Sequence, residues 1–257
     1  MKNDKPLISV LIAVHNSGRH LSEALKSIKT QSYKNLEILA IDDFSSDNSY
    51  EILRKFAKKD KRFKVKRNVK RYGIGITLNR LINRAKGDFI AFMDADDISM
   101  PDRLKKQLLF LKSNPQVAAV GTQCYFIGRN DKRLGKSKFP VENQNIYQSP
   151  LHGISMQFET LMINKTMLPK DVLKFHTKKN PFIYSDVFLK VLPYGRFANL
   201  SGFLHYHRNH PNEYFKDLRR NPASFVKLWI KSMALYNYNA PQKTFRSFFA
   251  PIIKTAS

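Results

Sequence analysis

Short apolar runs alternate with helix-length amphipathic segments over the first half of the chain, and this alternation limits the fold more than any other feature. The apolar runs have the length and the β-branched content of buried parallel strands. We predict strands at Ile8–Val14, Leu36–Ile41, Phe63–Lys66, Phe89–Met93 and Val117–Gly121, and helices at Arg19–Ser32, Ser45–Ala57, Gly75–Lys86 and from Pro101 to Ser113. Strands that alternate with helices in this way form βαβ units. The sequence therefore predicts an α/β fold with a mostly parallel sheet flanked by helices.

The composition excludes several classes of protein. The chain has 257 residues, which is enough to bury a large core, and its single cysteine, Cys124, excludes a disulfide framework or a cysteine-based zinc module. No apolar run approaches the roughly 18 residues that span a membrane. The N-terminus leads straight into a predicted strand and does not resemble a signal peptide. We therefore expect a cytoplasmic protein.

The net charge is strongly positive. Lys and Arg number 45 and Asp and Glu number 20, which gives +25 at pH 7, and the excess is spread along the chain. Such a surface attracts anions: nucleotides, nucleic acid or acidic lipid headgroups. No nucleic-acid-binding motif is present, so we expect no specific nucleic-acid partner.

Two acidic clusters stand out against this basic background. Asp42 and Asp43 follow the second predicted strand, and Asp94-Ala95-Asp96-Asp97 follows the fourth. The carboxyl ends of parallel strands meet at one edge of the sheet, where ligands bind in folds of this class. The alternative is structural, because Asp favours turns and helix caps. No glycine-rich phosphate loop of either common type is present.

The Asp94 cluster carries the clearer chemistry. Side chains alternate along an extended segment, so Asp94 and Asp96 are expected to point the same way. Two carboxylates aimed at one point repel each other unless a cation lies between them. Mg²⁺ and Mn²⁺ prefer such hard oxygen ligands and share their coordination shell with substrate phosphates. The sequence thus predicts a divalent metal site for a nucleotide diphosphate, with Lys70 and Arg71 adding positive charge.

Several spaced segments resemble the family 2 glycosyltransferases, which are inverting enzymes with the Rossmann-like GT-A fold. The segments are ISVLIAVHN at residues 8–16, LEILAIDDFSSDNS at 36–49, GIGITLNRLINRAKGDFIAFMDADD at 73–97, PYGRFANL at 193–200 and HYHRNHPN at 205–212. The resemblance implies a GT-A domain over residues 1–215, with a donor half at 1–125 and an acceptor half at 126–215. A basic, aromatic helical tail is expected to follow at 216–257.

The resemblance also implies roles for single residues. The expected donor-binding residues are Ala13, His15, Asn16, Asp42, Asp43, Arg71, Gly73, Asn79, Asp94 and Arg208. The expected ligands of Mn²⁺ or Mg²⁺ are Asp96, Asp94 and His210. Within this set, the turn at 13–16 and the Asp42 cluster would hold the base, commonly uracil, and Asp94 would face the ribose. The residues themselves leave one alternative, a zinc site of His205, His207 and His210, but a surface histidine cluster is favoured because no other ligand set is evident.

The acceptor half departs from the family pattern. The family has a Glu-Asp pair about a dozen residues before its Tyr-Gly, and the Asp of that pair is the general base. Ungapped counting back from Tyr194 reaches Ile183-Tyr184 instead. A short gap would bring Asp186 into this role, so Asp186 is the predicted base. The family's preceding His-Pro element reads Phe158-Glu159 here.

The expected reaction is therefore metal-dependent, inverting transfer of a hexose from a nucleotide-sugar, with a UDP-sugar favoured. The acceptor would be a glycan or a lipid-linked molecule in bacterial-type surface polysaccharide or glycoconjugate synthesis, and a base would take the proton of its hydroxyl. One alternative is a degenerate partner subunit that binds nucleotide-sugar with little transfer activity. A basic nucleic-acid-binding protein is the less favoured alternative.

The C-terminal stretch alternates basic and large apolar residues and has no acid between Pro222 and Ser257. One predicted helical face carries Phe225, Leu228, Trp229 and Ser232. An apolar face flanked by Lys and Arg is typical of a helix that lies in a membrane interface. The alternative is that this face packs on the catalytic domain. We expect peripheral binding to the anionic inner leaflet, where each basic residue contributes about 1 kcal/mol.

Overall fold

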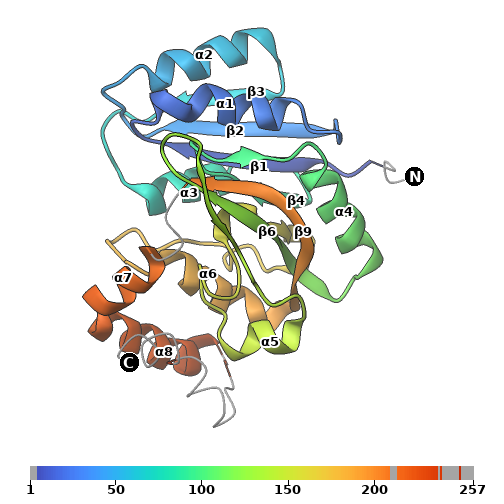
Figure 1. Cartoon of the computed structure of the whole chain (residues 1–257), viewed down its shortest axis with the longest axis vertical. Coiled ribbons are helices and arrows are strands. Elements are labelled where there is room, and N and C mark those ends of the chain that lie inside the picture. Colours follow the sequence, from blue (N-terminus) through green and yellow to red (C-terminus); the bar gives the residue numbers. More distant parts are fainter. Residues whose placement is uncertain (1–4, 209–212, 237, 239–248, 250–257) are drawn as a thin grey trace.

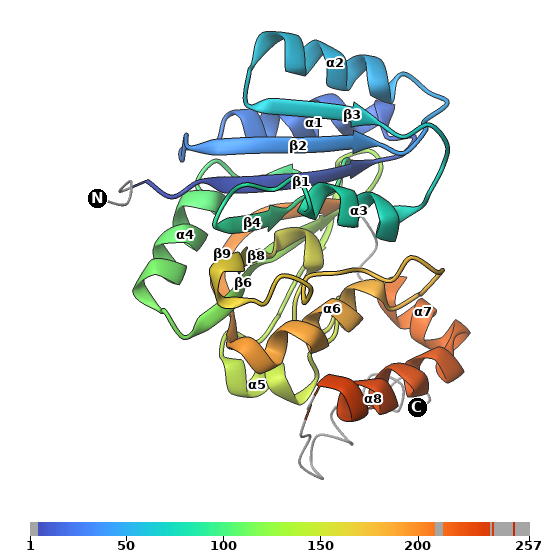
Figure 2. The ribbon, with the colours of Figure 1, turned by 180° about the vertical axis from the view of Figure 1, so that it is seen from behind.

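The computed structural model describes residues 5–208, 213–236, 238 and 249. Figures 1 and 2 show a curled central sheet with helices on both of its sides. The strands are β1 (Ile8–Val14), β2 (Leu36–Asp42), β3 (Phe63–Arg67), β4 (Phe89–Phe92), β5 (Ile98–Ser99), β6 (Val117–Ile127), β7 (Arg133–Lys136), β8 (Met162–Asn164) and β9 (Arg196–Arg208). This arrangement confirms the predicted α/β class and the GT-A type of sheet.

The sheet order is β3-β2-β1-β4-β8-β6-β9-β5, and β7 pairs with β6. The four strands from β3 to β4 are parallel, as the βαβ pattern predicts. β8 is antiparallel to both β4 and β6, while β6 and β9 run parallel beside each other. The carboxyl ends of β1, β2 and β4 therefore meet at one edge, which is where the two acidic clusters lie.

The helices are α1 (Gly18–Lys29), α2 (Ser49–Lys59), α3 (Ile74–Ile82), α4 (Arg103–Ser113), α5 (Asn143–Gln148), α6 (Ile183–Val191), α7 (Glu213–Arg220) and α8 (Pro222–Tyr236). Two hydrophobic cores cover the two faces of the sheet. One core contains Leu25 of α1 and Leu104 of α4, and the other contains Leu78 of α3 and Val187 of α6. Every β-branched residue of β1 is buried, which is why this strand reads as a continuous apolar run.

The C-terminal helices are part of the folded domain. The expected boundary at residue 215 falls inside α7, and Phe225 and Leu228 of α8 belong to the same core as α6. The apolar face predicted to meet a membrane is thus the face that packs on the domain, because Phe225, Leu228 and Ser232 are buried there. None of the described helices is both long enough and apolar enough to cross a bilayer.

Candidate active site

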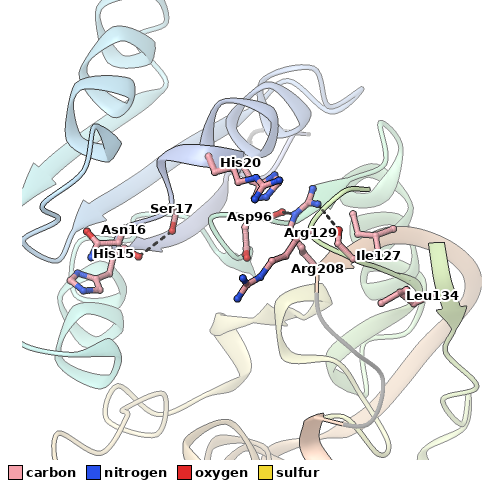
Figure 3. A pocket seen from close by; sticks show the side chains of 11 residues that line it. His15, Asn16, Ser17, His20, Asp96, Ile127, Arg129, Leu134 and Arg208 are labelled. Atoms are coloured by element: carbon pink, nitrogen blue, oxygen red, sulfur yellow. Dashed lines mark hydrogen bonds between the residues drawn. The ribbon is translucent and has the colours of Figure 1, made fainter. Parts of the chain in front are cut away.

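A cleft of about 840 Å³ opens at the carboxyl edge of the sheet. It is lined by His15, Asn16, Ser17, Arg19, His20, Asp96, Ile127, Gly128, Arg129, Leu134 and Arg208. Figure 3 shows His15 and Asn16 on one side of the cleft, and Asp96, Arg129 and Arg208 on the other. Segments that are far apart in the sequence therefore meet in one cavity, and most of its polar groups come from strand ends.

The turn after β1 is tied to the turn after β2. The backbone N–H of Asn16 donates to Ser45 Oγ over 3.0 Å, and Asn16 Oδ1 accepts from the Ser46 N–H over 2.9 Å. Nδ1 of His15 lies 2.9 Å from the carbonyl oxygen of Asp43. Asn16 has a φ of 50°, a left-handed conformation that Asn tolerates better than most residues. These bonds fix the predicted base-binding turn at the wall of the cleft.

The two acids after β2 have different partners. Asp42 is fully buried, and its Oδ2 accepts from the Ser45 N–H and lies 3.1 Å from Arg67 Nε. Asp43 accepts hydrogen bonds from the Tyr72 and Gly73 N–H groups, at 2.9 and 2.7 Å, and from Asn68 Nδ2. Burial alone would raise the pKa of Asp43, but these hydrogen bonds outweigh it and lower that pKa.

Asp43 therefore holds the loop that precedes α3. Gly73 has a φ of 86°, so the backbone there needs a glycine in order to present its N–H to the carboxylate. The neighbouring Arg71 is exposed on the same loop, and Ala13 lies on β1 opposite Ile41. Asn79 is placed differently from the expectation, because its side-chain amide is bonded at both ends to the backbone of Phe175 and does not line the cleft.

Asp94 and Asp96 follow β4 without a cationic partner. In the described part of the chain neither carboxylate forms an ion pair. Burial, followed by the negative charges of Glu159, Asp97 and Asp96, raises the pKa of Asp94 well above its usual range. Burial and then the charge of Asp97 raise the pKa of Asp96 to about 6. The positive charge of His207 offsets only part of this repulsion, and two mutually repelling carboxylates without an ion-pair partner fit a divalent cation, so these residues are compatible with Mn²⁺ or Mg²⁺. His210, the third expected ligand, lies outside the described residues.

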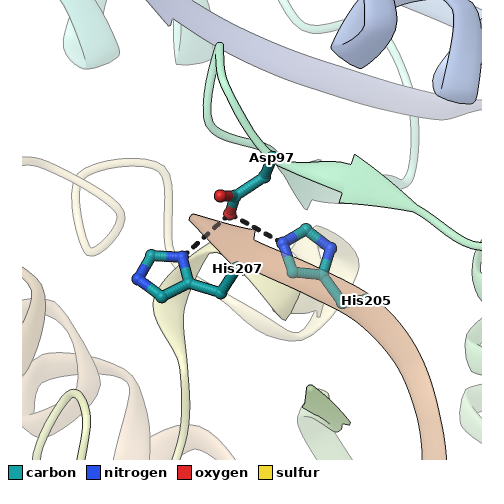
Figure 4. Close-up of side chains that lie close together, drawn as sticks. All are labelled: Asp97, His205 and His207. Carbon is teal, nitrogen blue, oxygen red and sulfur yellow. Dashed lines mark hydrogen bonds and ion pairs between the residues drawn. The ribbon is translucent and has the colours of Figure 1, made fainter. Parts of the chain in front are cut away.

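The third acid of this loop binds the C-terminal strand. Oδ2 of Asp97 lies 2.7 Å from His205 Nε2 and 3.0 Å from His207 Nδ1, and its Oδ1 accepts from the Arg208 N–H. Figure 4 shows the carboxylate between the two imidazoles of β9. The expectation of a surface histidine cluster is wrong for His205 and His207, because both are buried. The zinc alternative needs His210 and stays untested.

The charges in this cluster are balanced. Burial would raise the pKa of Asp97, but the charges and hydrogen bonds of His207 and His205 outweigh it and hold that pKa well below its usual range. Burial lowers the pKa of His205, whereas the nearby Asp97 carboxylate raises the pKa of His207 to about 10 despite its burial. Asp97 and His207 therefore form a buried ion pair that anchors the Asp94–Asp97 loop to β9.

Arg208 lines the cleft but is already engaged. Its Nε donates to the carbonyl oxygen of Asp96 over 2.8 Å, and its Nη1 contacts the carbonyl oxygen of Gly128 and Asp131 Oδ1. Glu23 of α1 lies 3.5 Å from Nη2. Arg208 thus connects the Asp94–Asp97 loop to the β6–β7 hairpin. Arg19 and Arg129 are cleft cations that the sequence reasoning missed, because neither belongs to a recognisable motif.

A buried arginine holds the end of β4, directly before the Asp94–Asp97 loop. The guanidinium of Arg103, on α4, donates to the carbonyl oxygens of Phe92 and Glu159. Burial lowers the pKa of Arg103 to about 10, which still leaves it charged at neutral pH. Phe92 ends β4, so this arginine fixes the strand end from which Asp94 follows. In the sequence it is indistinguishable from a solvated helical arginine.

The predicted base, Asp186, lies outside the cleft. Its Oδ1 accepts from Lys231 Nζ over 2.7 Å and from the Tyr236 hydroxyl over 3.0 Å, and Lys190 Nζ lies 2.8 Å from Oδ2. Burial would raise the pKa of Asp186, but the hydrogen bonds from Lys190 and Lys231 outweigh it and lower that pKa. A carboxylate in this setting joins α6 to α8, and it is poorly suited to accept a proton.

The position that ungapped counting assigns to the base is occupied by Tyr184. Its ring stacks on Phe158, with centroids 4.3 Å apart and an interplanar angle of 11°. Burial and the negative charges of Asp94 and Glu159 raise the pKa of Tyr184 well above its usual range, so it stays protonated. Glu159 is the acid of this region that the sequence reasoning did not assign, and it is buried next to Gln157.

Comparison with known proteins supports the expected family. The model of the family described as "Glycosyl transferase family 2" matches residues 9–172. An uncharacterized glycosyltransferase of Haemophilus influenzae is 30% identical over 217 residues, which cover 81% of this chain and 67% of the relative. The putative teichuronic acid biosynthesis glycosyltransferase TuaG of Bacillus subtilis is 34% identical over 111 residues, 43% of this chain and 44% of TuaG. The chain spans about half the length of several curated relatives that it matches.

Solved structures share the fold. S. aureus TarS 1–349 in complex with UDP-GlcNAc superposes with a TM-score of 0.71 at 18% identity, covering 96% of this chain and 72% of TarS 1–349. The mannosyltransferase PcManGT of Pyrobaculum calidifontis, in complex with GDP-Man and Mn²⁺, gives 0.67 at 17% identity, covering 98% and 75%. At these identities the likeness concerns the fold alone. The family match, which takes in the first turn and both acidic clusters, shows that this chain belongs to glycosyl transferase family 2.

Proposed function

We propose that the chain is a metal-dependent inverting glycosyltransferase that moves a hexose from a nucleotide-sugar, with a UDP-sugar favoured, to a glycan or lipid-linked acceptor. One observation carries this proposal: Asp96 lines the same cleft as His15 and Asn16, and among the described residues neither Asp96 nor Asp94 forms an ion pair. The ligands of the two structural neighbours, UDP-GlcNAc in one and GDP-Man with Mn²⁺ in the other, support a nucleotide-sugar donor. The name of TuaG, which refers to teichuronic acid biosynthesis, supports a role in polysaccharide synthesis, and the cytoplasmic side of the membrane is part of our proposal.

In this proposal two segments bind different parts of the donor: the loop Asp94–Asp97, which we call the metal-binding loop, and the turn at His15 and Asn16. Asp96 and Asp94 would hold Mn²⁺ or Mg²⁺, which stabilises the negative charge that develops on the departing diphosphate. The turn at His15 and Asn16 would hold the nucleoside, in the position that Asp43 and Ser45 fix. Arg19 and Arg129 add positive charge to the same cleft and would help to attract the diphosphate.

The base must take a proton from the acceptor hydroxyl. Asp186 remains the residue implied by the family resemblance, but Lys190, Lys231 and Tyr236 occupy its carboxylate. Glu159 is the second candidate: like Asp186 it does not line the donor cleft, but its negative charge acts on Asp94 at the metal-binding loop. Its Oε2 accepts a hydrogen bond from Gln157 Nε2 over 2.7 Å, and this bond orients the carboxylate.

A donor screen tests the function. The full chain is incubated with UDP-, GDP- and dTDP-hexoses and Mn²⁺, and both binding and nucleotide release are measured. We expect one donor to bind and to release its nucleotide only when a divalent cation is present. Binding without release, with every acceptor supplied, would favour the alternative of a degenerate partner subunit. Neither binding nor release with any donor would contradict the proposal.

Replacing the two acids after β2 separates their roles. Asp43→Ala removes the acceptor of the Tyr72 and Gly73 N–H groups, so we expect donor binding to weaken by about 1–3 kcal/mol. Asp42→Ala removes the partner of Arg67, and because Asp42 is buried and does not line the cleft, it should change thermal stability more than donor affinity. Isothermal titration with UDP and Mn²⁺, combined with thermal unfolding, checks both. Equal donor affinity in wild type and both variants would place base recognition elsewhere.

Two isosteric variants identify the base. If Glu159 is the base, Glu159→Gln should lower kcat by roughly 10²–10⁴-fold, the usual contribution of general base catalysis, with little change in donor affinity. Asp186→Asn should then retain most of the turnover and mainly lower thermal stability, because Lys190 and Lys231 lose their charged partner. The reverse pattern would return the role to Asp186. Rates are measured with saturating donor, and donor affinity is measured separately.

A further inference from the structure

A second, smaller pocket lies between α8 and the loop that leads into α6. It has a volume of about 190 Å³ and is lined by Lys179, Asn180, Pro181, Asp186, Ser224, Lys227, Leu228 and Lys231. At about 30 Å³ per water molecule it has room for roughly six waters, or for one phosphate group with its ester substituents. It shares no lining residue with the donor cleft.

The charges around this pocket are unbalanced. The single acid, Asp186, is already neutralised by Lys190 at 2.8 Å and Lys231 at 2.7 Å. Lys179 and Lys227 are exposed, and within the described residues neither takes part in an ion pair. Two ammonium groups therefore remain to attract an anion, and Ser224 and Asn180 can add hydrogen bonds. The pocket is thus suited to a phosphate group.

An apolar stripe runs along α8 beside the pocket. Val226, Ile230 and Met233 lie one helical turn apart and are 41%, 52% and 39% exposed. This stripe is separate from the buried face of Phe225 and Leu228 that holds α8 on the domain. Lys227 of the pocket lies three residues before Ile230 of the stripe, so these two side chains are neighbours on the helix surface and the stripe and the pocket adjoin there.

The geometry points to a docking site for an anionic membrane on this side of α8, in which the lysine pocket binds the phosphate of a lipid headgroup and the stripe enters the interface. Two observations favour a membrane over a protein partner. The sequence carries no acid from Pro222 to its last residue, and the whole chain has a charge of +25. Apolar residues flanked by lysines are what an interfacial helix presents to anionic lipid.

This site also suits the arrangement of the molecule. Figures 1 and 2 show α7 and α8 at the end of the molecule opposite α2, next to α6 of the acceptor half. Docking through α8 would therefore place the acceptor half toward the membrane and leave the donor half facing the solvent. The inference concerns where the protein binds, so it holds independently of whether the chain transfers sugar.

The test uses the full chain and co-sedimentation with vesicles of phosphatidylcholine, with and without phosphatidylglycerol. The charge-reversal variant is Lys179→Glu with Lys227→Glu, and the matched control is Lys58→Glu with Lys59→Glu on α2, which changes the net charge equally. Since one basic residue near an anionic surface changes binding roughly fivefold, we expect the pocket variant to bind anionic vesicles at least about 25-fold more weakly. The affinity of the control variant for anionic vesicles should fall much less.

A second pair of variants tests the stripe. Ile230→Ser should weaken vesicle binding, and Leu109→Ser on α4, which removes an equally exposed leucine, should not. Equal binding of the pocket variant and its control would overturn the proposal. Equal affinity for vesicles with and without phosphatidylglycerol would also overturn it. The same holds if sedimentation velocity shows a dimer that Ile230→Ser dissociates, while the vesicle binding of this variant is unchanged.

Two further measurements complete the test. Inorganic phosphate, added at constant ionic strength, distinguishes a lipid headgroup from free phosphate as the ligand of the pocket. We expect it to compete only weakly with vesicle binding. If free phosphate binds and the protein shows no preference for anionic vesicles, the lipid assignment is wrong. Nucleotide release in solution is measured for every variant. It should be unchanged, because none of the substituted residues lines the donor cleft, so loss of docking and loss of catalysis are read separately.

Discussion

Asp96→Ala is expected to abolish divalent-dependent donor binding and to leave the fold intact. Asp96 follows β4 and lines the donor cleft, and in the described structure it has no ion-pair partner, so its removal breaks no packing contact that the sheet needs. Its carboxylate is the proposed ligand of Mn²⁺ or Mg²⁺. Removing a group that stabilises charge in the transition state typically lowers kcat by roughly 10²–10³-fold, and we expect a loss of at least this size.

The measurement is a titration of Mn²⁺ against UDP binding and nucleotide release. Asp102→Ala provides the control, because Asp102 is exposed at the start of α4 and forms no side-chain cap. The control should keep the wild-type dependence on Mn²⁺. If Asp96→Ala also keeps it, the metal is bound elsewhere and the assignment of the Asp94–Asp97 loop is wrong.

In the first half of the chain the helices and strands predicted from the sequence agree closely with those of the structure. β1, β2 and β4 are short apolar runs, β3 is a short segment in which Phe63 is buried, and one helix lies between each consecutive pair of these strands, so the pattern of apolar residues places them. The two largest differences are of equal size: α3 ends at Ile82 rather than Lys86, and α2 begins at Ser49 rather than Ser45. The reason at α2 is local: Ser45 and Ser46 bond the turn at Asn16, so these residues are held out of the helix.

The second half could not be predicted in the same way, because it depends on pairing between distant segments. β8 is only three residues long and is inserted between β4 and β6. β6 continues to Ile127 rather than ending at Gly121, since it pairs with β9 along its length through several register shifts. Neither pairing leaves a period in the sequence that would reveal its partner.

The site shows the same division. Positions directly after two predicted parallel strands indicate that His15, Asn16 and Asp96 gather at one edge, the family resemblance adds Arg208, and all four residues line one cleft. The spacing does not predict which hydrogen-bond or ion-pair partner each acid of a cluster has. Asp97 is adjacent to Asp96 and is the same type of residue, yet its carboxylate contacts two histidines that lie more than a hundred residues away in the sequence.

That difference between adjacent acids leads to opposite expectations for stability. Asp97→Ala leaves the protonated His207 buried without its partner and removes the acceptor of the Arg208 N–H. Breaking a buried ion pair from one side costs about 3–5 kcal/mol, so we expect the free energy of unfolding to fall by this amount. Asp96→Ala should leave it unchanged or raise it slightly, because it removes a charge that Asp97 repels.

Urea denaturation measures both, with the midpoint and slope fitted separately so that a change in stability is distinguished from a change in exposed surface. The double variant Asp97→Asn with His207→Gln removes both charges of the buried pair, and it should recover part of the loss because no uncompensated charge remains. If Asp97→Ala is as stable as Asp96→Ala, then Asp97 does not anchor the metal-binding loop to β9. If instead the loss is large and the double variant shows no recovery, the loss does not come from an uncompensated charge at His207 and the ion pair is not the anchor, because the amide oxygen of Asp97→Asn can still accept from the Arg208 N–H.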